Sequence, residues 1–167
     1  VNADGTPVTP QVETYTNDDI GGLARVFTGW SWAAVGTTDL EFRGTHVTDP
    51  LQRIKPMKIY PQHHESGSKT FLGTTIAAGT SGEASLALAL DHLFNHQNLC
   101  PFIGKQLIQR LVTSNPAPAY VGRVSAACAN NGQGVRGDMK AITRAILLDA
   151  DARDASKVSD PQWGKVR

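Results

Sequence analysis

Apolar residues over positions 81–150 recur at i, i+3, i+4 and i+7, and this pattern limits the chain to a largely helical fold. That spacing places the apolar side chains on one face of an α-helix. Two polar breaks, Ser114-Asn115-Pro116 and Asn131-Gly132-Gln133-Gly134, divide the pattern, so we predict a four-helix part over 81–150. The predicted inward residues are Leu86, Ala89, Leu90, Leu93 and Phe94, then Ile103, Leu107 and Leu111, then Ala117, Tyr120, Val121, Val124 and Cys128, then Met139, Ile142 and Ile146.

Another helix is predicted near the start of the chain. Thr16 can accept a hydrogen bond from the amide of Asp19 while the Asp19 carboxylate reaches back, which is a capping box. Gly29 is a natural C-terminal stop. The fold class is therefore predicted as mainly α, a small bundle of about five helices. The predicted inward face of this helix is Ile20, Leu23, Ala24 and Phe27.

Residues 30–80 lose the helical period and are rich in Gly, Pro, Thr and His. We predict a long irregular loop region here, with residues 69–76 forming a short strand or β-hairpin. Long irregular stretches in compact proteins are often functional. A length of 167 residues fits one domain, so residues 1–167 are predicted to form a single domain or a fragment of a larger helical domain.

Charge and hydropathy argue against two classes of partner. The formal net charge is +1, without a basic run, whereas nucleic-acid binders usually carry a basic patch. Apolar stretches fall short of the roughly 18 residues that a membrane span needs. The chain begins at Val1 without a targeting segment and stops at Arg167 in a polar run, so we expect a fragment, left by a trypsin-like protease or by a designed boundary.

The two cysteines are predicted to form a disulfide. Cys100 lies at the start of one predicted helix and Cys128 near the end of the next, and a short connection makes such helices pack antiparallel. Both residues then lie at the open end of the helical hairpin. A disulfide implies an oxidising compartment. The alternative is two buried thiols that behave as small apolar residues.

The densest group of reactive side chains lies within residues 63–69. His64, Glu65 and Lys69 are candidate catalytic residues, because imidazole, carboxylate and ammonium groups can transfer protons. His64 and the upstream His46 are candidate ligands of a divalent metal. The alternative is a polar loop in which His64 and Lys69 hydrogen-bond to the backbone.

Three other patterns have simpler interpretations. Ser66 and Lys69 match the S-x-x-K spacing of serine acyl-enzymes, but Gly67 intervenes and the companion motifs are missing. His92 and His96 have the spacing of a two-histidine zinc face, but His96 is better placed to cap a helix end. Lys140 and Arg144 are predicted to belong to a solvated helical face.

Several stretches together resemble the bacterial family known as domain of unknown function 1800. They are Asn2-x-Asp4-Gly5-Thr6-Pro7, Tyr15-Thr16-x-x-Asp19 through Gly29-Trp30, His64-x-x-x-x-Lys69-Thr70-Phe71-Leu72-Gly73, Ala89-Leu90-Asp91-x-Leu93-x-x-His96-x-Asn98, Phe102-Ile103-Gly104-Lys105-Gln106-Leu107, Asp138-x-x-Ala141-x-x-Arg144-Ala145-Ile146-Leu147 and Trp163-Gly164-Lys165-Val166-Arg167. The resemblance implies a largely helical, exported bacterial protein that continues beyond this chain, with a periplasmic or extracellular location and no established activity.

Two positions depart from the pattern that the resemblance implies. Glu65 stands where the family often has Asp, which keeps a carboxylate, and Gln97 stands where it usually has Pro, which loosens a helix–helix turn. The cysteines are not part of the family pattern.

Our functional hypothesis is a non-catalytic helical scaffold or binding module of a larger exported bacterial protein. Its partner would be the remainder of the parent chain or another protein. The alternative is a metal-dependent or hydrolase-type enzyme with its site in the 46–73 loop. Convergence of His64, Glu65 and Lys69 in one cleft would favour the enzyme, and their separation would favour the scaffold.

Overall fold

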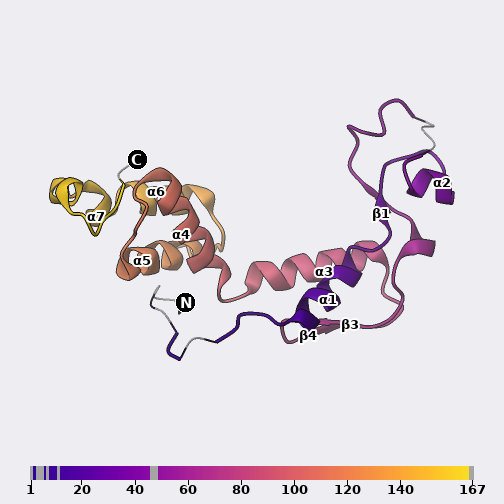
Figure 1. Ribbon diagram of the computed structural model, residues 1–167, viewed down its shortest axis with the longest axis horizontal. Helices are drawn as coiled ribbons and strands as arrows, with labels where there is room; N and C mark the ends of the chain where they lie inside the picture. The colour runs from indigo at the N-terminus through magenta and orange to yellow at the C-terminus, as the bar shows by residue number, and fades with distance from the viewer. Residues whose placement is uncertain (1, 3–5, 7, 11, 46–48, 166–167) are drawn as a thin grey trace. The chain divides into compact units, whose positions relative to one another are not determined.

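The computed structural model describes residues 2, 6, 8–10, 12–45 and 49–165, and it is mainly α-helical, as predicted (Figure 1). The longest helices of the described residues fall on the predicted helical segments. They are α1 (Asn17–Val26), α3 (Gly82–Asn95), α4 (Leu99–Leu111), α5 (Pro118–Ala129) and α6 (Met139–Leu147). Short helices α2 (Asp39–Phe42) and α7 (Ala150–Arg153) supplement them. None of the described helices has the length and apolar character that a membrane crossing requires.

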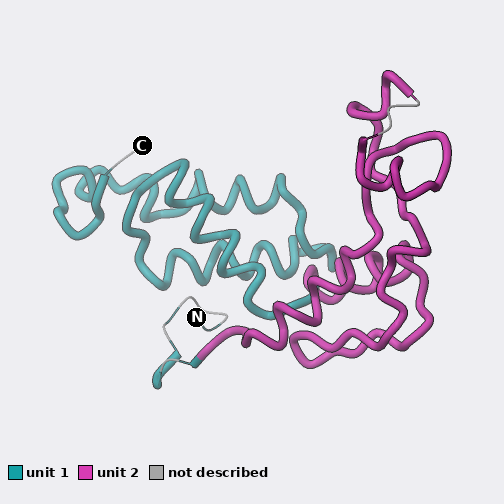
Figure 2. Tube along the Cα trace, turned by 45° about the vertical axis from the view of Figure 1, so that its right-hand side comes forward, with its two compact units in different colours: residues 1–12, 95–167 teal, residues 13–94 magenta. Residues whose placement is uncertain are grey.

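The chain forms two compact units (Figure 2). One unit spans residues 13–94, and the other comprises residues 95–167 together with the described residues before position 13. In the 13–94 unit, β3 (Lys69–Phe71) and β4 (Thr74–Ile76) form an antiparallel hairpin in which Lys69 pairs with Ile76. This confirms the hairpin predicted from the sequence. The core of this unit combines α1, the hairpin and α3 through Val26, Phe71, Ile76 and Ala89.

Helix α1 begins with the predicted capping box. Thr16 Oγ1 accepts a hydrogen bond from the amide of Asp19, whose Oδ2 accepts one from the amide of Thr16 at 2.7 Å. Asp19 Oδ1 also accepts a hydrogen bond from Leu72 N at 2.6 Å, which ties the helix to the hairpin turn. These backbone donors, first Thr16 and then Leu72, hold the pKa of the Asp19 carboxyl below its ordinary value.

The predicted inward face of α1 is wrong in part. Ile20 and Phe27 are 52% and 49% exposed, and the helix instead buries Gly22 and Val26. A Cβ on Gly22 would lie 1.8 Å from Thr70 O, so only glycine permits this close approach of helix and strand. The packing of Gly22 against β3 therefore turns the Gly22 and Val26 side of the helix toward the core and leaves its most apolar side partly exposed.

Short elements interrupt the stretch between α1 and the hairpin. Strands β1 (Trp30–Ser31) and β2 (Lys58–Ile59) pair antiparallel, and the 3₁₀ helix η1 (Pro61–His63) follows β2. Tyr60 is fully buried between β2 and η1, and its hydroxyl donates to Trp32 O at 2.8 Å. These contacts fix the position of the segment that connects β2 to the loop carrying His64.

The 95–167 unit is a helical cluster around one core. Tyr120 is fully buried and donates a hydrogen bond from its hydroxyl to Ile146 O at 2.6 Å, joining α5 to α6. The Trp163 ring stacks against the Tyr120 ring with centroids 6.1 Å apart. The other buried apolar residues of this core are Cys100, Ile108, Val112, Val121, Val124, Cys128, Ile142 and Ile146.

Polar side chains fix the ends of α6 and α7 in this unit. Asp138 caps α6 by accepting from Lys140 N and Ala141 N, and Asp149 caps α7 by accepting from Asp151 N. The guanidinium of Arg123 forms two hydrogen bonds of 2.7 Å with the Asp149 carboxylate. Met139, predicted to point inward, is 55% exposed. The next residues of α6 along that line, Thr143 and Leu147, are exposed as well, so Ile142 and Ile146 carry the buried face.

Candidate functional site

The loop that carries His64 is attached to the end of α1. Thr28 Oγ1 donates to Arg25 O at 2.7 Å and accepts from Glu65 N at 2.8 Å. Gly29 has a φ of +81°, and a Cβ there would lie 2.9 Å from His64 N. Glycine is therefore required for the loop to lie this close to the helix end.

The imidazole of His64 is oriented by a main-chain oxygen. Its Nδ1 lies 2.9 Å from Thr28 O and 3.4 Å from Thr28 Oγ1. A carbonyl oxygen only accepts hydrogen bonds, so Nδ1 carries a proton and, in the neutral ring, Nε2 presents a lone pair. Nε2 is buried and has no hydrogen-bond partner within the described part of the chain.

Glu65 and Lys69 each bind the backbone of the residue between them. Glu65 Oε1 accepts from Gly67 N at 2.9 Å, and Lys69 Nζ donates to Gly67 O at 3.2 Å. Glu65 is exposed, whereas Lys69 is fully buried. Among the ion pairs of the described residues, none joins these two side chains. The two groups therefore shape the turn at Gly67 from either side.

The other histidines of this unit point to separate partners. His63 Nε2 lies 3.0 Å from Asp39 Oδ1, and its ring stacks on Phe42 with centroids 3.9 Å apart. His92 Nε2 lies 3.0 Å from Leu72 O. The adjacent His63 and His64 thus bond to different segments and do not share a partner.

The predicted metal ligands cannot be compared as a pair, because His46 lies outside the described residues. Within residues 2, 6, 8–10, 12–45 and 49–165, no group of three or more His, Cys, Asp or Glu side chains is arranged to hold a metal ion. His64 alone of the predicted pair is placed, with its Nδ1 used for Thr28 O.

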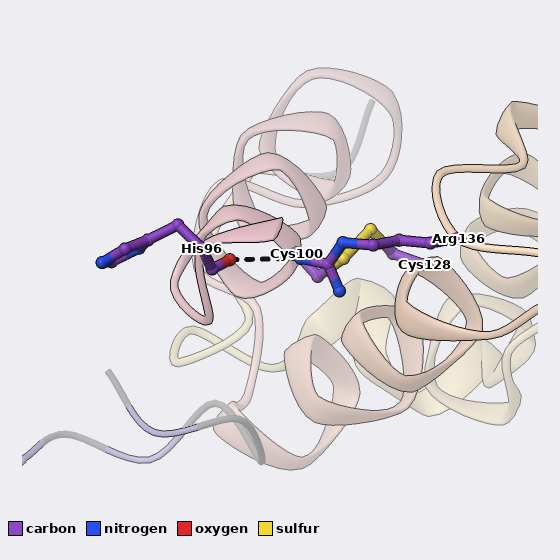
Figure 3. The surroundings of a disulfide bond; sticks show 4 residues. All are labelled: His96, Cys100, Cys128 and Arg136. Carbon is purple, nitrogen blue, oxygen red and sulfur yellow. Dashed lines mark hydrogen bonds between the residues drawn. A yellow bond between two sulfur atoms is a disulfide. The ribbon is translucent and has the colours of Figure 1, made fainter. Parts of the chain in front are cut away.

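The predicted disulfide is present. Cys100 at the start of α4 and Cys128 near the end of α5 are joined, with their Cα atoms 5.6 Å apart (Figure 3). The guanidinium of Arg136 donates to His96 O at 3.1 Å beside this bond. His96 Nδ1 accepts from Asn98 N at 3.2 Å, so this imidazole shapes the turn that leads into α4. Both cysteines are buried, which makes the disulfide a structural link between the two helices.

Sequence analysis missed a recess on the surface of α6. It has a volume of about 510 Å³ and is lined by Met139, Lys140, Thr143, Arg144, Leu147 and Leu148. We call this surface the α6 groove. The sequence did contain a signal for it, because Met139, Thr143 and Leu147 are spaced four residues apart and lie on one line along a helix.

Comparison with known proteins identifies a family without a known activity. A family model described as "Protein of unknown function (DUF1800)" matches residues 5–166. Neither the curated proteins nor the solved structures contain a match to this chain.

Proposed function

The chain belongs to this DUF1800 family of proteins of unknown function, and from that premise we propose that it acts as a helical scaffold or binding module rather than as an enzyme. The proposal concerns a larger exported bacterial protein of which this chain is a part. Its partner is the remainder of that protein or another protein.

One observation carries the proposal: His64, Glu65 and Lys69 all bind main-chain groups instead of one another. His64 bonds to Thr28 O, and the other two bond to the N–H and C=O of Gly67. General acid–base or nucleophilic chemistry needs such groups within hydrogen-bond reach of one another or of a shared substrate atom. Side chains that hold a loop in shape support a structural role.

Exposed apolar side chains support the binding part of the proposal. Ile54 and Val35 are 80% and 77% exposed, and half-exposed leucine, phenylalanine and methionine side chains occur in both units. A contiguous apolar patch is typical of an interaction site, whereas single exposed apolar residues are common on any protein surface, so the apolar side chains that gather at the α6 groove carry this part of the argument. Covering them with a partner would remove this apolar area from water.

The Cys100–Cys128 disulfide supports a location in an oxidising compartment, such as the bacterial periplasm or the cell exterior. Cytosolic reductants would keep two such thiols reduced in most bacteria. We therefore propose export of the parent protein.

A metal-dependent or hydrolase-type enzyme is the second candidate, and two observations favour it. His64 Nε2 offers a buried lone pair, and a ring whose other nitrogen donates to a carbonyl is the usual arrangement of a metal-binding histidine. Lys69 is a fully buried ammonium group whose acceptor, within the described residues, is the neutral oxygen of Gly67. A buried cation of this kind costs stability, and a protein is expected to carry such a cost at a functional site.

Elemental analysis of the purified protein, beside a His64→Ala variant, separates the two candidates. The scaffold proposal predicts no stoichiometric metal in either protein. Near-stoichiometric zinc, iron or manganese that disappears in the variant would overturn it and support the enzyme. His63→Ala is the matched control, because it removes the adjacent imidazole, which contacts Asp39 and Phe42 instead of Thr28.

A further inference from the structure

Helix α6 has an apolar line on its surface in addition to its buried face. Ile142 and Ile146 are buried in the core, whereas Met139, Leu147 and Leu148 are 55%, 48% and 55% exposed. Thr143 lies between Met139 and Leu147 on the surface line, and its hydroxyl donates to Met139 O at 2.8 Å. Because that hydroxyl is bonded within the helix, the Thr143 methyl group contributes to an apolar strip.

Two cations flank this strip at the α6 groove. Lys140 and Arg144 both line the recess, are exposed and lie one helical turn apart. Neither side chain forms an ion pair with a carboxylate of the described residues. The groove thus combines an apolar floor with two positive charges that have a fixed spacing along the helix.

We propose that the α6 groove binds an amphipathic helix of another protein that carries acidic residues beside its apolar face. Apolar side chains of that helix fill the recess between Met139 and Leu147. Two of its carboxylates, one turn apart, pair with Lys140 and Arg144. The inference rests on the proposed function as a binding module, and it names the partner class and the surface.

Charge at the ends of α6 favours a helix over an anionic membrane as the occupant. Asp138 caps the start of α6, and Asp149 and Asp151 follow its end. A flat anionic surface would face these carboxylates together with Lys140 and Arg144. An acidic helix can place its carboxylates against the two cations alone and lay its apolar side chains along the strip from Met139 to Leu147.

Two fluorescently labelled helical peptides test the proposal, with binding measured by fluorescence anisotropy at low salt. Both peptides carry the same apolar face of leucine residues. One peptide carries Glu residues one turn apart beside that face, and the other carries Lys at the same positions. We expect micromolar binding of the acidic peptide and binding of the basic peptide that is about tenfold weaker or more. The Leu147→Ser variant should weaken binding of the acidic peptide about fivefold, because it removes apolar contact from the groove.

Charge reversal provides the sharper result. The double variant Lys140→Glu and Arg144→Glu should prefer the basic peptide. A double variant on α4, Lys105→Glu and Arg110→Glu, changes the net charge equally and should keep the preference of the wild-type protein. Thermal unfolding of every variant establishes that the helical unit remains folded.

Three outcomes would overturn the inference. The first is failure of the peptide test: the acidic peptide does not bind, or the preference for the acidic over the basic peptide survives charge reversal on α6. The second is binding to phosphatidylglycerol vesicles, lost in the α6 variant, without peptide binding, which would assign the groove to a membrane. The third is a dimer in solution that the α6 variant dissociates, which would assign it to a second copy of the chain. If the peptide test fails, the scaffold proposal still stands, because it is tested separately by the metal content of the wild-type protein and the His64→Ala variant.

Discussion

The imidazole Nδ1 of His64 lies 2.9 Å from the main-chain oxygen of Thr28, so the loop after η1 is fastened to the end of α1 by a histidine. The amide of the next residue, Glu65, donates to the Thr28 hydroxyl. Two hydrogen bonds to one threonine thus hold together segments that are distant in the sequence. This arrangement gives His64 a structural task whatever else it does.

The contact between Gly22 and β3 predicts opposite effects for two adjacent glycines. Gly22→Ala places a methyl group 1.8 Å from Thr70 O and should cost about 2–3 kcal/mol of stability in the 13–94 unit. Gly21→Ala meets nothing within 4 Å and should stabilise the helix by about 0.5–1 kcal/mol. Urea unfolding, monitored by hydrogen exchange at residues 69–76, measures the change in stability of both variants. Equal stability of the two variants would contradict the close packing.

Removal of the disulfide should destabilise the helical unit. Replacing both Cys100 and Cys128 with Ser should lower its free energy of unfolding by about 3–4 kcal/mol, because the bond closes a loop across 28 positions of sequence. Urea unfolding without reductant compares the variant with the wild type. Reduced wild-type protein is the control and should resemble the variant. A mass increase on alkylation of the unreduced wild type would show that the bond does not form.

The carboxyl of Asp149 should make the helical unit sensitive to acid. Burial opposes its ionisation, but the hydrogen bonds from Arg123 and from the amide of Asp151 outweigh burial and lower the pKa of Asp149. A lowered pKa stabilises the fold above the unfolded value of about 3.9, and this stability is lost as the pH falls through the folded value. Thermal unfolding from about pH 6 to pH 2 measures the loss.

The Asp149→Asn variant tests this account of acid sensitivity. It should cost about 1–2 kcal/mol at neutral pH, since the half-exposed Arg123 limits the strength of the pair, and its stability should vary less with acid. Asp151→Asn is the control, because Asp151 contributes one hydrogen bond to Arg123, of 2.9 Å. Equal acid dependence in Asp149→Asn and the wild type would exclude Asp149 as the source.

The helices and the capping box at Thr16 and Asp19 were predictable because each follows from local spacing. The disulfide was predictable because a short connection makes its two helices antiparallel, which brings Cys100 and Cys128 to the same end. The rotation of α1 was not, since it depends on how closely Thr70 approaches Gly22 from a strand far along the chain. The exposure of Met139 was likewise hidden, because helical periodicity allows either of two apolar lines on α6 to face the core. The sequence offered, as one alternative, that His64 hydrogen-bonds to the backbone, but it could not identify Thr28 as the partner, because the two segments are far apart and follow no periodic pattern.

Thermal unfolding of His64→Ala beside His63→Ala tests the structural role of the loop most directly. Loss of the part-buried bond to Thr28 O should cost about 2 kcal/mol in the His64 variant, whereas loss of the exposed bond between His63 and Asp39 should cost about 0.5–1 kcal/mol. That contrast is the result we predict. A His64→Ala protein as stable as the wild type, but stripped of a bound metal ion, would contradict the scaffold account.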